Sequence, residues 1–336
     1  MANIKDVAKQ AGVSIASVSR VLAGRAGVGK TTRQRVLKAI QALDYRPDLA
    51  AQRLRSRRTD TIGLIVSDIR NPFFTEISRA VEDMAYQNRM RVILCNADED
   101  PEKERLYLDL MRDEKVSGVI LSPSLSILAR FQISDYPFPV VLIDRCDRET
   151  IADAVVLDNT DSAYRLTVHL IEQGYRRIMF IYDMTSATGQ QRHEGYVMAM
   201  ATRGLETQVK VVPTPVRATV DVAHAIVSEL VRGQLLPDAL IGSNGLILLG
   251  IIQALREVRL QFPEQIALAG FDDSPWTQLQ GPGITVIAQP VYDIGQAATE
   301  LLLQRIAHPS QPMRRVVLPG ELRKRGSSAR RTGATD

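Results

Sequence analysis

Residues 1–58 hold the feature that most limits what this chain can fold into, because short helical patterns and a strong positive charge coincide there. Residues 1–60 contain 13 Lys and Arg against 4 Asp and Glu, a net charge of +9. The rest of the chain contains 29 against 34, a net charge of −5. A basic field confined to one small unit favours phosphate binding, as in a DNA-binding headpiece.

The start of the chain predicts a helix followed by a tight turn. Ile4, Val7, Ala8 and Ala11 recur at helical spacing. Gly12 follows them and ends the helix, because glycine adopts a left-handed backbone without strain.

A second helix is predicted over residues 15–22, with Ser14 as its cap and Val18, Val21 and Leu22 packing inward. A DNA major groove admits one helix and is read from the N-terminal part of that helix. We therefore expect base or phosphate contacts from the exposed start of this segment, which comprises Ile15, Ala16, Ser17, Ser19 and Arg20.

Residues 32–43 predict a third helix, and Pro47 then stops helical structure. Asp48 can cap a short helix over residues 49–54, which is marginal alone. We expect it to form only against DNA and a second copy of itself, so that Leu54 wedges between base pairs in the minor groove. The alternative is a solvated basic linker.

Several motifs together resemble the lactose-repressor (LacI/GalR) family: IKDVA at 4–8, AGVS at 11–14, SVSRVL at 17–22, LDYRP at 43–47 and AQRL at 51–54. The resemblance runs through nearly the whole chain and departs from the family's asparagines at Ala23 and Asp48. It implies DNA contacts from Ile4, Ser14, Ile15, Ala16, Ser17, Ser19, Arg20, Thr31, Tyr45, Ala51, Gln52, Leu54 and Arg55.

The segment GRAGVGKT at 24–31 matches the phosphate-loop pattern and raises the alternative of an ATPase. That pattern binds phosphate only where a strand precedes it and a helix follows. Residues 17–22 have helical spacing, so we interpret the glycines as a loop between two helices.

From Thr59 onward, short apolar runs alternate with helical patterns, which predicts parallel sheets covered by helices. Strands are expected at 62–66, 92–95, 119–122, 140–143, 154–157, 178–181, 211–213, 240–242, 266–269 and 284–288. Helices are expected at 74–86, 101–113, 161–172, 192–202, 220–231, 246–257 and 292–306.

The predicted fold is an all-α helix-turn-helix headpiece followed by an α/β core of two doubly wound parallel-sheet lobes, similar to periplasmic binding proteins. We expect a headpiece at 1–46, a hinge helix and linker at 47–58, and an effector-binding and dimerisation domain at 59–322. Lobe 1 covers about 59–159 and 290–318, and lobe 2 about 160–289 and the C-terminal part. Residues 323–336, rich in Arg, Gly and Ser, are expected to be a flexible tail.

Polar and aromatic side chains follow the predicted strands, where open α/β sheets bind ligands. Two aromatics can sandwich the apolar face of a sugar while polar groups satisfy its hydroxyls. The pattern is similar to that of ribose-type binding proteins. Either a neutral pentose or a sugar acid such as a ketogluconate fits it. The candidate effector-binding residues are Asn71, Phe73, Phe74, Asp144, Arg145, Arg192, Asn244, Asp272, Gln289 and Trp276.

Composition limits the other classes of function. Cys95 and Cys146 do not indicate a disulfide framework, and no apolar signal segment or membrane-length run is present, so a cytoplasmic protein is expected. The histidines lack metal-ligand spacing and no nucleophile motif occurs, so we expect no metal, cofactor or enzyme activity. We predict a homodimeric, possibly higher-oligomeric, transcriptional repressor of carbohydrate genes that binds a palindromic operator. A transport-type sugar-binding protein is the alternative.

Overall fold

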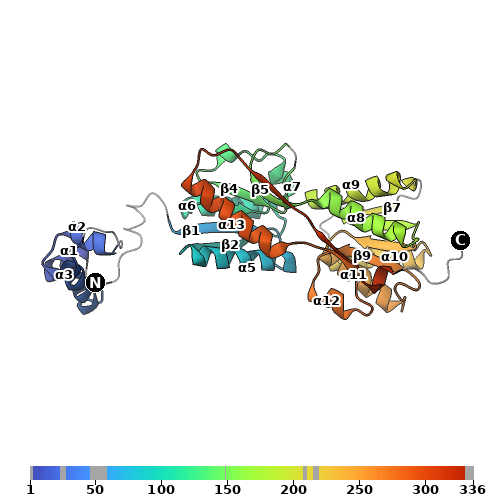
Figure 1. Ribbon diagram of the computed structural model, residues 1–336, viewed down its shortest axis with the longest axis horizontal. Helices are drawn as coiled ribbons and strands as arrows, with labels where there is room; N and C mark the ends of the chain where they lie inside the picture. The colour runs from blue at the N-terminus through green and yellow to red at the C-terminus, as the bar shows by residue number, and fades with distance from the viewer. Residues whose placement is uncertain are drawn as a thin grey trace. The chain divides into compact units, whose positions relative to one another are not determined.

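The computed structural model describes residues 3–22, 28–45, 59–147, 149–206, 210–214 and 219–329 of the chain (Figure 1). Two compact units are formed, by Met1–Thr59 and by Asp60–Asp336. The predicted hinge helix and its residues Ala51, Gln52, Leu54 and Arg55 lie outside the described residues. None of the described helices is long and apolar enough to cross a membrane.

The headpiece consists of three helices around a small core: α1 (Ile4–Ala11), α2 (Ile15–Leu22) and α3 (Lys30–Ala42). The first two helices match their predicted bounds, and α3 begins two residues before the predicted start at 32. Val7, Val18 and Val36 are fully buried, one from each helix. Helices this short are marginal alone, so their packing against one another stabilises them.

The turn between α1 and α2 has the predicted chemistry. Gly12 has a φ of 59°, and its carbonyl accepts a hydrogen bond from Arg35 Nη2 at 3.1 Å, which ties the end of α1 to α3. The Ser14 hydroxyl accepts from the Ser17 amide at 3.1 Å and caps α2. Together these bonds hold α2 against the rest of the headpiece with its start exposed.

The phosphate-loop pattern does not have the surroundings that phosphate binding requires. Helix α2 ends at Leu22, immediately before the glycine segment, and Lys30 is the first residue of α3. Because a helix rather than a strand precedes the pattern, the segment lacks the strand–loop–helix order that a nucleotide cradle requires.

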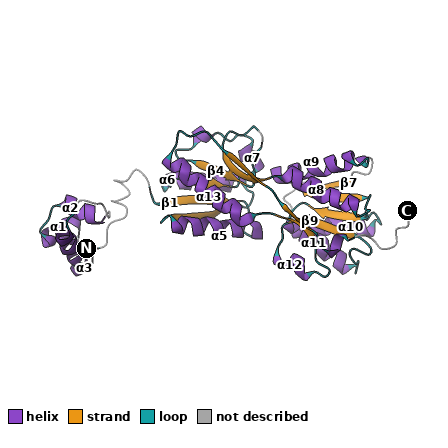
Figure 2. Ribbon diagram, viewed as in Figure 1, coloured by secondary structure: helices purple, strands orange, loops and turns teal. Residues whose placement is uncertain are grey.

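Lobe 1 of the larger unit is a fully parallel sheet in the order β11-β5-β4-β3-β1-β2. Helices α5 and α13 cover one face, and α6 lies on the other (Figure 2). Its strands are β1 (Thr61–Val66), β2 (Arg91–Asn96), β3 (Val119–Leu121), β4 (Val140–Ile143), β5 (Asp153–Leu157) and β11 (Arg315–Leu318). Its helices are α5 (Pro72–Gln87), α6 (Pro101–Asp113), α7 (Leu125–Leu128), η1 (Ile133–Asp135) and α13 (Val291–Ala307).

Lobe 2 is a second six-stranded sheet in the order β12-β10-β9-β8-β6-β7. Helices α8 and α9 cover one face and α10 and α11 the other. Its strands are β6 (Ile178–Asp183), β7 (Lys210–Thr214), β8 (Ala239–Gly242), β9 (Ala267–Phe271), β10 (Thr285–Ala288) and β12 (Glu321–Arg323). Its helices are α8 (Asn159–Glu172), α9 (Ala187–Thr202), α10 (Val220–Arg232), α11 (Gly245–Glu257), α12 (Pro275–Leu279) and η3 (Gly326–Ser328).

The two doubly wound lobes confirm the predicted fold class, with one difference at a sheet edge. Strand β12 pairs antiparallel with β10, so lobe 2 is not purely parallel. Strands β11 and β12 are absent from the sequence prediction, because they are short and largely exposed. The chain crosses between the sheets after β5, after β10 and between β11 and β12 (Figure 1).

The prediction that the chain is flexible from Arg323 onward is wrong as far as Ala329. Ser327 and Ser328 are fully buried. The Ser327 hydroxyl donates to the Leu268 carbonyl at 2.6 Å, and the Ser328 hydroxyl lies 2.8 Å from His169 Nε2. Small polar residues that satisfy buried hydrogen bonds have the same composition as a disordered tail, which explains the error.

A buried ion pair fixes the return from α13 to β11 in lobe 1. Arg305 Nε lies 2.7 Å from Asp153 Oδ2, and the two side chains are 6% and 1% exposed. The guanidinium also donates to the carbonyls of Pro309 and Pro312, at 3.0 and 2.8 Å. One cation therefore satisfies a buried carboxylate and a turn that contains no regular structure.

Replacing Arg305 with alanine should destabilise the protein by about 3–5 kcal/mol, because it leaves the Asp153 carboxylate buried without its cation. Urea unfolding followed by circular dichroism measures this loss. Arg232→Ala is the matched control, since Arg232 pairs with Glu229 at the surface, and it should cost less than about 1 kcal/mol. Equal stability of the two variants would show that the buried pair has no structural role.

Candidate functional site

The headpiece presents the start of α2 to solvent, as the helix-turn-helix prediction requires. Ile15, Ala16 and Arg20 are exposed, and Ser17 and Ser19 are half-buried. The opposite side of the helix is buried in the headpiece core. The exposed side therefore combines small apolar groups, hydroxyls and one cation, which is chemistry suited to base edges and phosphates.

The other predicted DNA contacts in the headpiece have different surroundings. Ser14 and Thr31 are exposed at the starts of α2 and α3. Ile4 and Tyr45 are half-buried and pack on the headpiece core, so at least part of each side chain has a structural role.

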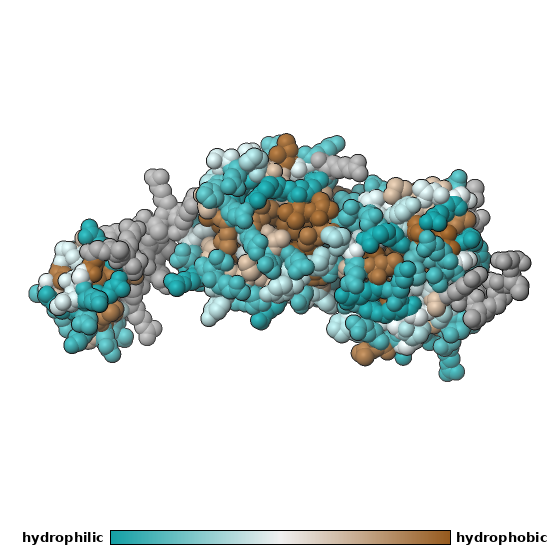
Figure 3. Space-filling view, viewed as in Figure 1, coloured by the Kyte–Doolittle hydropathy of each residue, from teal (hydrophilic) through white to brown (hydrophobic). Residues whose placement is uncertain are grey.

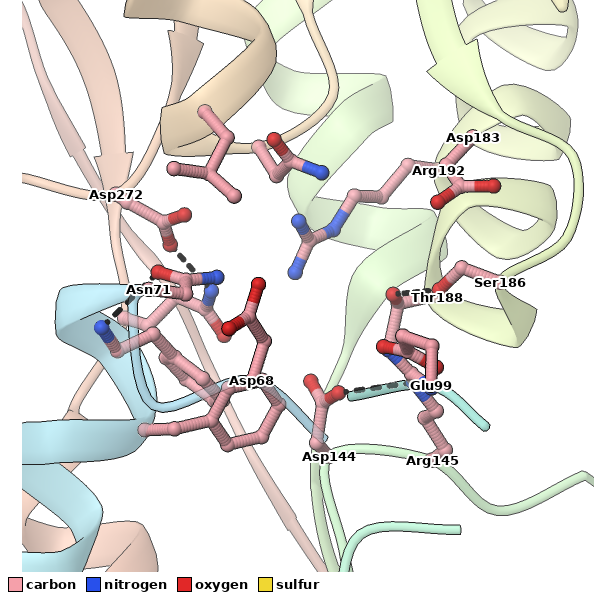
Figure 4. A pocket seen from close by; sticks show the side chains of 15 residues that line it. Asp68, Asn71, Glu99, Asp144, Arg145, Asp183, Ser186, Thr188, Arg192 and Asp272 are labelled. Carbon is pink, nitrogen blue, oxygen red and sulfur yellow. Dashed lines mark hydrogen bonds and ion pairs between the residues drawn. The ribbon is translucent and has the colours of Figure 1, made fainter. Parts of the chain in front are cut away.

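The larger unit contains a cleft between its lobes, where the predicted effector residues meet (Figure 4). Its unfilled volume, including the open mouth, is about 530 Å³. Nine of the ten predicted residues line it: Asn71, Phe73, Phe74, Asp144, Arg145, Arg192, Asn244, Asp272 and Gln289. Trp276 does not; it packs against the apolar core of lobe 2, so its assignment to the pocket is wrong.

The lining residues gather because parallel strands all end at the same edge of a sheet. Asn71 and Asn244 follow strands and cap the next helices, accepting from the Phe73 amide at 3.1 Å and the Ile247 amide at 2.9 Å. Asp144 and Asp272 directly follow β4 and β9 and have left-handed backbones, with φ of 64° and 72°. Such strain is typical of residues that a functional site holds in place.

Asp272 is anchored from both sides within the cleft. Its carboxylate accepts from the Gly245 amide at 2.8 Å and from Gln289 Nε2 at 2.6 Å. A β-carbon on Gly245 would lie 3.3 Å from the Asp272 side chain, so glycine permits the close approach. The carboxylate therefore has a fixed direction and can accept hydrogen bonds from ligand hydroxyls.

Arg192 lies in the cleft with 3% of its surface exposed. Its Nε donates to Asn159 Oδ1 at 2.7 Å and its Nη1 to the Ser243 carbonyl at 2.6 Å, and the guanidinium lies 4.0 Å from the ring centre of Phe271. Burial lowers the pKa of Arg192, against the opposing effect of the Asp272 and Asp144 charges. These contacts hold the guanidinium rigidly at the edge of the cavity.

Arg145 lies on the lobe 1 side of the cleft and pairs with two carboxylates. Glu99 bonds it in a bidentate arrangement at 2.5 and 2.6 Å, and Asp144 Oδ2 lies 3.2 Å from Nε. Burial tends to lower the pKa of Arg145, but the charge and hydrogen bonds of Glu99 outweigh it and raise the pKa. Burial raises the pKa of Asp144, against the opposing effect of Arg145.

The aromatic side chains line only one wall, so the expected sandwich of a sugar between two aromatics is wrong. Phe73 and Phe74 contact each other edge to face, with ring centres 5.0 Å apart and planes at 79°. Both belong to the apolar core of lobe 1. The adjacent rings can cover one face of a ligand, and Leu246 is the apolar lining residue from lobe 2.

Sequence reasoning missed six lining residues: Asp68, Glu99, Asp183, Ser186, Thr188 and Leu246. Asp68 and Asp183 occupy strand ends, the same signal that identified Asp144 and Asp272. Ser186 and Thr188 escaped because α9 begins at Ala187, five residues before its predicted start. Glu99 follows β2 within a turn, and its role depends on Arg145, which is 46 residues away.

No group of three or more His, Cys, Asp or Glu residues in the described parts of the chain has the geometry of a metal site. Cys95 and Cys146 are buried and free. The polar groups that line the cleft are carboxylates, guanidiniums, amides and hydroxyls.

A further carboxylate holds the Asp272 loop to the C-terminal segment. Asp273 Oδ1 lies 2.7 Å from Arg325 Nη1, and Asp273 Oδ2 lies 2.5 Å from Arg323 Nη1. The Thr277 hydroxyl donates to the same carboxylate at 2.8 Å. The segment wrongly predicted to be flexible thus supports the loop that carries a cleft residue.

Comparisons with known proteins agree with this architecture. Residues 3–48 match the family described as bacterial regulatory proteins, lacI family, and residues 167–328 match the periplasmic binding protein-like domain. The ribose operon repressor of Halalkalibacterium halodurans is 34% identical over 323 residues, covering 96% of each chain. The chain belongs to the lacI family of bacterial regulatory proteins.

Solved structures of this regulator family share the fold. A lac repressor dimer bound to operator and the anti-inducer ONPF superposes with a TM-score of 0.87 at 22% identity, over 98% of this chain and 99% of that chain. A LacI family regulator from Enterococcus faecium with bound ribose has a TM-score of 0.71 at 28% identity, over 80% and 99%.

The Asp273 ion pairs should make stability depend on pH in acid. Burial tends to raise the pKa of Asp273, but its bonds to Arg325, Thr277 and Arg323 outweigh this and lower the pKa to about 2. The unfolded value is about 3.9, so the stabilisation is complete above that pH and is lost as the pH falls through about 2.

In Asp273→Asn the loss of stability between these pH values should be smaller than in the wild type, although the variant is less stable at neutral pH. Thermal unfolding at a series of pH values measures how the stability of each protein changes with pH. Glu229→Gln controls for removal of a charge at the surface. If the stabilities of Asp273→Asn and the wild type changed equally with pH, the lowered pKa of Asp273 would be contradicted.

Proposed function

We propose that this lacI-family regulator is a homodimeric repressor of carbohydrate uptake or catabolism genes, controlled by a small sugar bound between the lobes. The headpiece supports operator binding through the exposed start of α2. The polar cleft with one aromatic wall supports a polyhydroxylated ligand. A ribose operon repressor and a ribose-bound regulator among its relatives favour a sugar of similar size.

One observation carries the proposal: cleft residues bond to residues at the crossings between the lobes. Arg192 donates to Asn159, which begins α8 just after the crossing from β5. Gln289, at the crossing after β10, donates to Asp272. A ligand that prefers one arrangement of these bonds shifts the lobe equilibrium, and linkage requires operator DNA to change ligand affinity in return.

Exposed apolar side chains on both lobes support the homodimer. Leu94 and Leu106 are 43% and 63% exposed on β2 and α6 of lobe 1. Leu279, at the end of α12 in lobe 2, is 82% exposed, and an apolar patch lies over that helix (Figure 3). A two-fold dimer would cover such patches and pair two headpieces with a palindromic operator. Because the proposed target is operator DNA, we place the protein in the cytoplasm.

Arg20→Ala should weaken specific operator binding by about 5- to 150-fold, which corresponds to losing one contact worth 1–3 kcal/mol. Wild-type affinity should fall steeply with salt, because the headpiece neutralises phosphates. Gel-shift titrations at several salt concentrations test both. Arg232→Ala, which removes a cation from α10 of lobe 2, should bind operator as the wild type does. An operator affinity that does not change with salt concentration would contradict the proposal that the headpiece binds DNA phosphates.

Asp272→Ala should lower sugar affinity by about 5- to 150-fold, since it leaves ligand hydroxyls without an acceptor in the cleft. Operator binding without sugar should survive. A thermal-shift screen of pentoses and hexoses identifies the sugar, and calorimetry compares the variants. Glu229→Ala, at an exposed site on α10, is the matched control. An Asp272→Ala protein that responds to sugar at wild-type concentrations would place the effector elsewhere.

A further inference from the structure

The bidentate face of Arg145, the group best suited to bind a carboxylate ligand, is already occupied. Glu99 takes Nη1 and Nη2, at 2.6 and 2.5 Å. Asp144 Oδ2 lies 3.2 Å from the remaining nitrogen, Nε, and the Pro123 carbonyl accepts from Nη1 at 3.3 Å. A ligand carboxylate would have to displace Glu99 before it could form the paired hydrogen bonds that arginine offers.

Arg192 is also partly occupied by protein partners. Its Nε and Nη1 donate to Asn159 and to the Ser243 carbonyl, which leaves Nη2 for a ligand. A ligand carboxylate could therefore pair with Arg192 only by sharing Nη1 with the Ser243 carbonyl, whereas a single hydroxyl oxygen needs Nη2 alone. In Figure 4 the Arg192 guanidinium points into the cavity that Asp272 faces from the other side.

The charge of the lining also opposes an anion. The lining holds five carboxylates and two guanidiniums, a formal charge of −3: Asp68, Glu99, Asp144, Asp183 and Asp272 against Arg145 and Arg192. Arg70, which pairs with Asp68 at 3.0 Å, reduces this to −2. A neutral Asp144 would still leave −1. An anionic ligand beside this excess of carboxylates would be repelled, whereas ligand hydroxyls can donate to the carboxylates.

The turn that carries Glu99 is built to hold this side chain toward Arg145. Asp98 and Glu99 both have left-handed backbones, with φ of 54° and 57°. The Glu99 amide donates to the Ser67 carbonyl at 3.0 Å, which fixes the turn beside β1. Lys103 bonds Asp98 at 2.7 Å and holds the turn from α6. Glu99 is therefore positioned by contacts that involve no ligand.

We infer that Glu99 is a specificity-determining residue: by occupying Arg145 it makes the cleft select an uncharged polyhydroxylated ligand and reject sugar acids. This inference rests on the proposed function and decides between the two ligand classes that the sequence left open. Glu99 acts through Arg145 and through its own negative charge, and both effects disfavour a ligand carboxylate.

The test compares pairs of sugars in which a carboxylate replaces one hydroxymethyl group on the same ring. Glucose with glucuronate, and galactose with galacturonate, are matched ring-closed pairs, and ribose and xylose extend the panel to neutral pentoses. Calorimetry gives the dissociation constants for wild-type protein, Glu99→Gln and the control Glu102→Gln. Glu102→Gln removes the same charge from the exposed start of α6, where Glu102 pairs with Arg105.

Wild-type protein should bind the neutral members of the panel at least about tenfold more tightly than the acids. Glu99→Gln should reduce that preference by about tenfold or more, because it frees Arg145 and removes one negative charge. Glu102→Gln should keep the wild-type ratio. Glu99→Asp, which keeps the charge, should retain most of the preference.

A sugar acid that binds wild-type protein more tightly than its neutral partner would overturn the inference, and so would a panel in which no neutral sugar binds. An unchanged preference in a folded Glu99→Gln protein would also overturn it. Operator gel shifts on the same samples separate the two proposals. If a sugar acid alters operator binding, only the inference about Glu99 is contradicted. If the protein binds no operator, the proposed function is contradicted.

Discussion

The parallel arrangement of the strands in both lobes is the constraint on which the candidate site depends. Parallel strands end at one edge of a sheet, and the crossings after β5 and β10 turn that edge of each lobe toward a common cleft. Asp144 and Asp272 then occupy equivalent places, each directly after a strand and each with a left-handed backbone. Backbone strain of about 1–3 kcal/mol at such residues persists only where neighbours hold them, as Gly245 and Gln289 hold Asp272.

This regularity explains how much of the molecule could be predicted from its sequence. Buried parallel strands are continuous apolar runs, so β1 and β4 could be predicted from the sequence. Polar residues just beyond such runs identified the cleft. Trp276 follows the same pattern by position, but its side chain packs into the core of lobe 2, a choice that depends on side-chain direction. Glu99 could not be predicted as a cleft residue because its partner, Arg145, is distant in the sequence. Ser327 and Ser328 were predicted to be flexible because their segment resembles a disordered tail in composition.

The headpiece is organised by a different balance. Each of its first two helices has eight residues, too few to be stable in isolation. A capping box at Asn3 and Asp6, the left-handed Gly12 and one fully buried valine per helix together offset that weakness. The excess of positive charge destabilises so small a unit through repulsion, and bound phosphates would relieve it. The composition that opposes folding is therefore the composition that favours the proposed partner.

The contacts of Arg192 indicate how the cleft can be coupled to the crossings. The guanidinium is held by Asn159 at the start of α8 and by the Ser243 carbonyl at the end of β8. Arg192 lies on α9, and Ala187, the first residue of α9, packs in the apolar core of lobe 1. Helix α9 thus contacts one lobe through its first turn while it belongs to the other. A ligand bonded to Arg192 would therefore contact a helix that touches both lobes. The proposed coupling needs such a contact, because an effector shifts an equilibrium only through a differential interaction with the two lobe arrangements.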